Sequence, residues 1–226
     1  MIVSKRKPIE QILHALREDQ KVFLVGCAGC AEAVGAGGEV QTGELKQELE
    51  QAGKVVTGWV VIDFLCNKTL VGRRLARYLE PLEEASALVV LSCGVGVQAV
   101  SAVVEQPTYP ANDSISLGGL SGVWRSDERC ATCGNCVLEY TGGICPVTMC
   151  AKGLLNGPCG GSQNGECEVE PGRPCGWMLI YERLKQLNRV ERLKEFVPPR
   201  DYSKMLPHRE VRESRFWALE REGGDL

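Results

Sequence analysis

Cysteine is the residue that most constrains this chain. Twelve of its 226 residues are cysteine; eight of them lie within residues 130–175, and the other four are dispersed over the first half. Thiols at this density serve as disulfide partners or as metal ligands. The N-terminal residues have a basic start but lack the unbroken apolar stretch of a secretory signal. We therefore expect a cytoplasmic protein, in which reducing conditions disfavour disulfides and favour metal binding.

The remaining composition is that of a folded protein and excludes two kinds of partner. Hydrophobic residues make up 44% of the chain and charged residues 24%, which is typical of globular domains. The formal net charge is -3, so the chain lacks the excess of Lys and Arg that nucleic-acid binding requires, and we expect no nucleic-acid partner. No apolar run approaches the roughly 18 to 20 residues of a membrane-spanning helix, so we also expect no membrane span.

Strand and helix signals alternate along the first half of the chain. Apolar or β-rich runs occur at residues 21–25, 54–65 and 87–91, and helix-compatible segments occur at residues 72–85 and 97–104. This alternation predicts an α/β domain with an open, mostly parallel sheet and flanking helices. Residues 114–117 are expected to add a last strand.

The ends of the chain complete the predicted organisation. An amphipathic helix is expected after Pro8, and another helix at residues 177–196, followed by a polar tail with prolines. Such a tail cannot build its own core, so we expect it to lie along a partner chain. The predicted domains are an α/β cluster-binding domain at residues 1–120, a loop-rich, ferredoxin-like cysteine domain at residues 121–197, and the tail at residues 198–226.

The four dispersed cysteines fall near the ends of the predicted strands. Cys27 follows the first strand, Cys66 ends the second, Cys93 follows the third, and Cys30 lies one turn beyond Cys27. The carboxyl ends of parallel strands meet at one edge of a sheet, where open α/β proteins place their sites. The pattern therefore predicts one metal site with four thiolate ligands.

Two other interpretations apply to these four cysteines. Either Cys66 or Cys93 taken alone is better explained as a buried core residue, because free cysteine is common in protein cores. Cys27 and Cys30 also have the C-x-x-C spacing of a redox-active dithiol after a strand. The convergence of all four at one sheet edge favours the metal site. The glycine-rich residues after Cys27 do not fit the G-x-G-x-x-G pattern of a nucleotide site.

Three closely spaced cysteines in the second half favour an iron–sulfur cluster. Cys130, Cys133 and Cys136 have the C-x2-C-x2-C spacing with which a ferredoxin-type loop reaches neighbouring corners of a [4Fe-4S] cubane. Cys145 is followed by proline, as in such motifs, although the gap before it is eight residues instead of three. Structural zinc usually takes two well-separated pairs of ligands, which this triple spacing does not provide.

The eight cysteines of the second half are enough for two four-thiolate sites. Either Cys175 or a ligand near Cys145 could complete the first cubane, and the sequence leaves this pairing open. A zinc site remains an alternative within residues 150–175, where the spacing has no cubane signature. We expect two or three [4Fe-4S] clusters, with three favoured. The candidate ligands are Cys27, Cys30, Cys66, Cys93, Cys130, Cys133, Cys136, Cys145, Cys150, Cys159, Cys167 and Cys175.

No catalytic residue is predicted. The chain contains only two histidines, His14 and His208, and neither lies in a catalytic motif. Asp63 and Asp113 lie near predicted strand ends without a partner for acid–base chemistry.

A resemblance to a known family adds to this interpretation. Residues 130–184, with the strings TGGICP and AKGLLNGPCGG, closely resemble the cysteine-rich C-terminal domain associated with methylenetetrahydrofolate reductases. With its GCAGC, DFLCNK and LSCGVGVQ segments, the chain as a whole resembles the small iron–sulfur subunits of acetogen-type reductases. The resemblance implies [4Fe-4S] clusters and a role in electron transfer within the acetyl-CoA (one-carbon) pathway.

The resemblance also implies a catalytic partner. In that family, a MetF-type subunit with a flavin in a (β/α)8 barrel reduces methylenetetrahydrofolate to methyltetrahydrofolate. The present sequence has neither a convincing phosphate loop nor eight barrel repeats, which agrees with a non-catalytic role. A ferredoxin or another flavoprotein is a further possible partner, as electron donor. The alternatives are a zinc-binding assembly subunit of the same complex and a dithiol redox protein.

Overall fold

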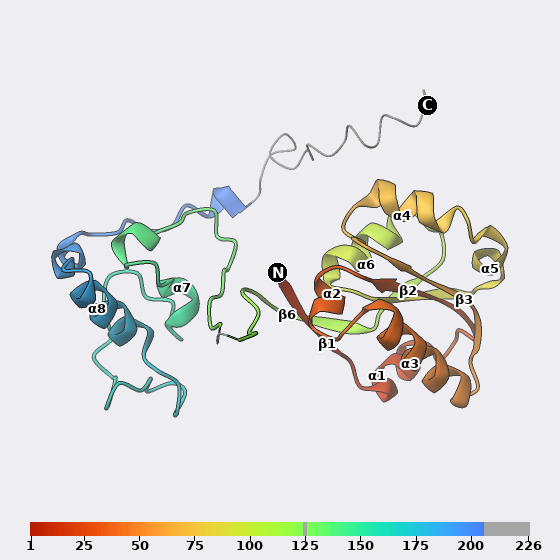
Figure 1. Ribbon diagram of the computed structural model, residues 1–226, viewed down its shortest axis with the longest axis horizontal. Helices are drawn as coiled ribbons and strands as arrows, with labels where there is room; N and C mark the ends of the chain where they lie inside the picture. Colours follow the sequence, from red (N-terminus) through yellow and green to blue (C-terminus); the bar gives the residue numbers. More distant parts are fainter. Residues whose placement is uncertain (124–125, 206–226) are drawn as a thin grey trace, which may run out of the picture. The chain divides into compact units, whose positions relative to one another are not determined.

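The computed structural model describes residues 1–123 and 126–205 and divides the chain into two compact units (Figure 1). The first unit comprises residues 1–120 and the second residues 121–226. In the described residues, no helix combines the length and the apolar character needed to cross a bilayer.

A four-stranded parallel sheet forms the centre of the first unit. The strands lie in the order β3-β2-β4-β5. Their bounds are β2 Lys21–Cys27, β3 Val55–Ile62, β4 Ala87–Leu91 and β5 Thr108–Pro110. Each neighbouring pair runs parallel, which confirms the predicted α/β class. The three-residue strand β5 is an addition that the sequence did not indicate.

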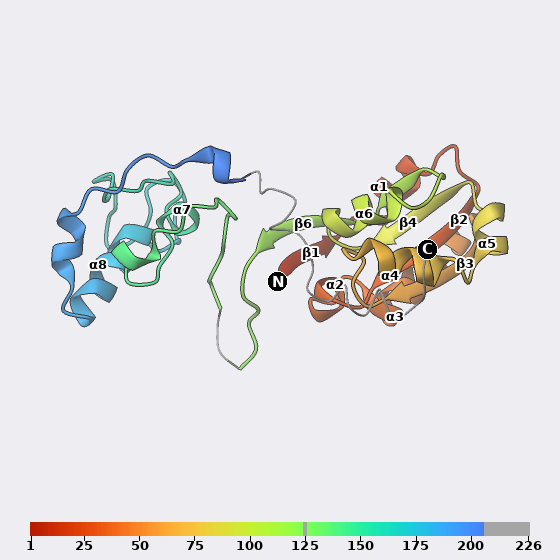
Figure 2. The same cartoon turned by 90° about the horizontal axis from the view of Figure 1, so that it is seen from above.

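Helices cover both faces of this sheet, as Figures 1 and 2 show. One face is covered by α1 (Ile9–Ala15) and α3 (Gly38–Gln51), and the other by α4 (Lys68–Leu75), α5 (Leu79–Glu84) and α6 (Gly94–Ser101). The pleat of β2 explains the two layers, because successive side chains of a strand point to opposite faces. Leu24 packs with the α3 side chains Leu45 and Leu49, whereas Phe23 and Val25 belong to the core on the other face.

Several elements differ from the sequence-based prediction. The expected helix at residues 72–85 is two helices, α4 and α5, which are separated by a turn. The expected last strand is β6 (Asn112–Leu117), which pairs antiparallel with β1 (Ile2–Arg6) instead of joining the parallel sheet. Strand β1 was not predicted, because it has only five residues and the last three of them are polar.

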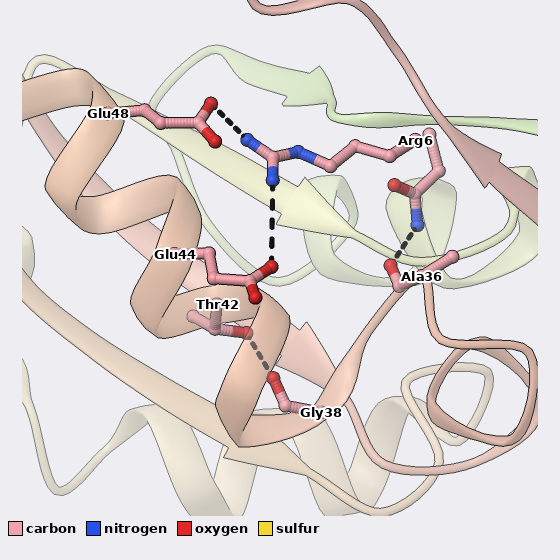
Figure 3. Close-up of polar contacts among 7 residues, drawn as sticks. Arg6, Ala36, Gly38, Thr42, Glu44 and Glu48 are labelled. Carbon is pink, nitrogen blue, oxygen red and sulfur yellow. Dashed lines mark hydrogen bonds and ion pairs between the residues drawn. The ribbon is translucent and has the colours of Figure 1, made fainter.

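Polar contacts tie β1 and β6 to the rest of the first unit (Figure 3). The guanidinium of Arg6 forms an ion pair with Glu48 of α3 and lies 4.0 Å from Glu44, one turn earlier. The Asn112 side-chain amide donates a hydrogen bond of 2.7 Å to the carbonyl of Ala36. These contacts hold the segment that joins the preceding short helix α2 (Cys30–Ala33) to α3. Helix α2 carries Cys30, one of the candidate ligands.

The second unit is rich in loops and has only short helices in its described part. They are the 3-10 helices η1 (Leu138–Tyr140), η2 (Val190–Lys194) and η3 (Tyr202–Met205), and the α-helices α7 (Pro146–Met149) and α8 (Gly176–Gln186). Its small core consists of Trp177, Ile180 and Leu184 of α8, packed with Ile144 and Leu154. Helix α8 is thus shorter than the predicted helix at residues 177–196. The expected likeness to a ferredoxin domain stays a prediction.

A side-chain cap fixes the start of α4, directly after Cys66. The side-chain oxygen of Asn67 accepts a hydrogen bond of 3.2 Å from the backbone N–H of Leu70. We expect Asn67→Ala to lower the free energy of unfolding of the first unit by about 1 kcal/mol, because an orphaned helix N–H loses its partner. Denaturant unfolding measures this loss. Asn67→Asp keeps the cap and should unfold like the parent; an equal loss in both variants would contradict the capping role.

Candidate metal centres

All twelve cysteines are free thiols in the structure, and none is paired in a disulfide. Their sulfurs are therefore available as ligands. The structure distributes them among three groups of four, called here the first, second and third set. The first set is Cys27, Cys30, Cys66 and Cys93; the second is Cys130, Cys133, Cys136 and Cys145; the third is Cys150, Cys159, Cys167 and Cys175.

The first set lies at the carboxyl edge of the parallel sheet. Cys27 is the last residue of β2, Cys30 begins α2, Cys66 follows β3 in a loop, and Cys93 directly precedes α6. Partial burial raises the pKa of the Cys66 thiol, although the residue as a whole is exposed, and the charges of Cys27, Cys93 and Cys30 raise it further. Like charges act in this way only at short range. The other three thiols therefore lie near Cys66, and their common role as metal ligands stays a prediction.

Strand order explains why the chain brings these four residues together. From β2 the chain passes to β3 on one side of the sheet and then crosses to β4 on the other side. Such a reversal opens a crevice at the carboxyl ends of the strands. Cys27 is only 7% exposed there, whereas Cys66 is exposed and Cys93 is half-buried. The alternative that Cys66 and Cys93 are buried core residues is therefore wrong.

The second set surrounds a cavity of about 360 Å³, which all four of its cysteines line. Cys130, Cys133 and Cys136 come from one loop, and Cys145 directly precedes α7. The backbone N–H of Thr132 donates to the Cys130 sulfur at 3.3 Å, which is the type of contact that stabilises a ligating thiolate. Cys145 thus lines the same cavity as the triple motif and Cys175 does not, which favours Cys145 as its fourth ligand; the pairing itself stays a prediction.

Electrostatics in the second set favour a thiolate. A backbone hydrogen bond at Asn135 lowers the pKa of the Cys133 thiol, and the nearby guanidinium of Arg200 lowers it further. Sequence reasoning did not indicate Arg200. It lies 67 positions after Cys133 and in no motif, so only the folded chain reveals the proximity.

The third set lines a much smaller pocket, of about 20 Å³. Cys150 directly follows α7 and Cys175 directly precedes α8, while Cys159 and Cys167 come from the intervening loops. The Cys159 thiol lies 3.2 Å from a carboxylate oxygen of Glu168, which also forms an ion pair with Lys152. Neither charged residue was a sequence-based candidate.

The donor chemistry and the cavity volumes fit metal centres to different degrees. Four thiolates suit iron–sulfur clusters or zinc. The second cavity has room for a multi-atom cluster, whereas the third pocket is little larger than the roughly 10–15 Å³ that one water molecule needs. Within residues 1–123 and 126–205, no three His, Cys, Asp or Glu side chains are grouped in a way that suits a single metal ion. The ligand role of the twelve cysteines stays a prediction.

Fold and sites together define a two-unit protein with an α/β sheet and three sets of four free thiols. Residues 109–203 match a family model described as "Methylene-tetrahydrofolate reductase C terminal", and this segment contains the second and third sets. The match relates residues 109–203 to the C-terminal segment of methylenetetrahydrofolate reductases, in which the sequence resemblance is strongest. Comparison with curated proteins gave no match, and neither did comparison with solved structures.

The predicted tail is described only in part. Residues 198–205 belong to the second unit and contact its own cysteine loop at Gly134 and Asn135. His208 and the remainder of the tail lie outside the described residues. Its expected contact with a partner chain therefore stays a prediction.

Proposed function

We propose that this chain is the electron-transfer iron–sulfur subunit of a methylenetetrahydrofolate reductase, equivalent to the small MetV-type subunit of the acetogen enzymes. The observation that carries the proposal is the division of twelve free thiols into three sets of four. The family match over residues 109–203 supports the link to the reductase.

The residues of the three sets have a definite task in this proposal. Bound [4Fe-4S] clusters would supply one-electron transfer. Cys27, at the buried end of β2, would anchor the first centre in the sheet, and the exposed Cys66 would leave its other side accessible. Cys130, Cys133 and Cys136 would hold the second centre from one loop, with Cys145 as the ligand from the start of α7.

We assign folate chemistry to a partner subunit. The first unit is an open sheet of four parallel strands and not a barrel of eight. A MetF-type subunit would contribute a flavin, which can take up electrons singly and deliver a hydride to methylenetetrahydrofolate. A ferredoxin or another flavoprotein would be the electron donor. The present chain would thus connect one-electron donors to a two-electron reduction.

A second candidate is suggested by one observation. The pocket of the third set is far smaller than the cavity of the second, and a single zinc ion needs less room than a cluster. Because the described side chains are not grouped for one ion, Cys150, Cys159, Cys167 and Cys175 would have to draw together around it. In that case the third set would have a structural role in assembly of the complex, and electron transfer would use the other two sets.

Metal analysis of protein purified without oxygen separates these candidates. We expect about twelve iron atoms per chain if all three sets hold [4Fe-4S] clusters, and about eight with one zinc if the third set holds zinc. Acid-labile sulfide should equal iron, and EPR of the reduced protein should show cluster signals. A preparation with zinc alone, or with neither metal, would contradict the electron-transfer role.

A further inference from the structure

Residues 197–205, called here the basic strap, extend from the helical part of the second unit to its cysteine loop. The strap begins at Val197, which is only 4% exposed. The backbone N–H of Val197 donates to the Asn156 side-chain oxygen at 2.8 Å, and the Asn156 amide donates to the Val197 carbonyl at 2.9 Å. This reciprocal pair fixes one end of the strap.

The other end of the strap lies directly on the loop that carries Cys130, Cys133 and Cys136. A β-carbon placed on Gly134 would lie 2.6 Å from the carbonyl oxygen of Lys204, so only glycine permits this approach, and its φ of +70° also favours glycine. The Lys204 ammonium donates to the side-chain oxygen of Asn135 at 3.4 Å. The strap therefore covers the loop between its second and third cysteines.

Between these two ends, the strap positions a guanidinium. Arg200 donates from Nη2 to the Tyr202 hydroxyl at 3.0 Å, and its guanidinium carbon lies 4.9 Å from the centre of the Tyr202 ring. The neighbouring carboxylate of Asp201 accepts hydrogen bonds from the backbone and hydroxyl of Ser203, at 3.0 and 2.6 Å. Asp201 is thus used within the turn, while the guanidinium of Arg200 contacts the Cys133 side chain, next to Gly134.

We infer that the basic strap is a tuning element for the reduction potential of the centre at Cys130, Cys133, Cys136 and Cys145. Arg200, which Tyr202 holds beside the cysteine loop, raises this potential. Reduction adds one electron from the donor, and therefore one negative charge; no proton is transferred, and no bond is formed or broken. A fixed cation beside a ligand sulfur stabilises the reduced form more than the oxidised form. Net charge and contacts to the ligand sulfurs are known to set cluster potentials.

This inference rests on the proposed presence of a redox centre in the second set and is tested by an EPR-monitored redox titration of the full chain, purified without oxygen. Arg200→Gln removes the charge and keeps a side chain of moderate length. We expect the reduction equilibrium of one centre to become about tenfold less favourable, a fall of about 59 mV for a one-electron couple. The potentials of the other centres serve as internal references and should not move.

Two further variants separate charge from structure. Arg192→Gln removes an equal charge from the same unit, but Arg192 pairs with Glu195 and not with a cysteine, so its potentials should match the parent's. Arg200→Lys keeps the charge and should recover at least half of the shift. Tyr202→Phe loses the hydroxyl that holds Arg200 and should lower the potential by less than Arg200→Gln.

The outcomes distinguish this inference from the proposed function. Unshifted potentials in Arg200→Gln, or an equal fall in Arg200→Gln and Arg192→Gln, would overturn the tuning role while the iron content still supported electron transfer. If Arg200→Gln loses iron, the other two variants decide the question. Reduction potentials in Tyr202→Phe equal to those of the parent would overturn the inference. A fall in potential that is larger in Tyr202→Phe than in Arg200→Lys would support it. Absence of iron from the parent would contradict the proposed function itself.

Discussion

Replacing Cys145 by alanine should remove one complete metal centre, about four iron atoms per chain, and leave the centre of the third set in place. Cys145 lines the same cavity as Cys130, Cys133 and Cys136, whereas Cys150, only five positions later, lines another. Helix α7 separates the two cysteines, since Cys145 directly precedes it and Cys150 directly follows it. Its four residues span about 6 Å, enough to direct the two thiols into different sets.

Double variants make this assignment decisive. If Cys130 and Cys145 serve one centre, Cys130→Ala/Cys145→Ala should lose no more metal than either single variant. If Cys145 and Cys150 serve different centres, Cys145→Ala/Cys150→Ala should lose the metal of two. Iron, zinc and sulfide analysis gives both counts, and circular dichroism checks that the first unit remains folded. A double loss from the Cys130/Cys145 pair would contradict the second set as defined here.

The sequence was sufficient to predict that the first set lies at one edge of the sheet, whereas the ligand role of these cysteines stays a prediction. Apolar runs located the strands β2, β3 and β4, and the parallel connection of α/β proteins then placed Cys27, Cys66 and Cys93 at one edge. The prediction did not need the strand order, because every parallel strand ends at the same edge. By contrast, β1 could not be found from its own residues, because its pairing with β6 is a contact between the two ends of the first unit.

The partition of the other eight cysteines required the folded chain. Loops have no periodicity from which neighbours can be inferred, and Cys175 was as plausible a fourth ligand for the triple motif as Cys145. Packing of α8 against α7 places Cys175 beside Cys150 and away from the cavity of the triple motif, which favours Cys145 as the fourth ligand there. Arg200 was beyond prediction for the same reason, since its approach to Cys133 depends on the hydrogen bonds that fix Val197 and on the close contact at Gly134.

The contact between α7 and α8 leads to a second large expected effect, at Gly176. A β-carbon at this position, the first of α8, would lie 2.7 and 2.8 Å from the carbonyl carbon and oxygen of Met149, and 2.9 Å from the nitrogen of Cys150. These are backbone atoms, which cannot rotate away as a side chain can. Gly176→Ala should therefore push α8 from α7, separate Cys175 from Cys150, and destabilise the second unit by about 1–3 kcal/mol.

The sign of this effect makes the test informative. Within a helix, alanine is ordinarily more stable than glycine by about 1 kcal/mol, so a Gly176→Ala variant without the clash would be stabilised. Gly72→Ala is the matched control, because Gly72 lies in α4 and has no atom within 4 Å of the added β-carbon. Denaturant unfolding should show a loss in Gly176→Ala and no loss in Gly72→Ala. Metal analysis should show that Gly176→Ala lacks only the metal of the third set. If this variant instead kept its full metal content and gained stability, α7 and α8 would not be what holds Cys150 and Cys175 together.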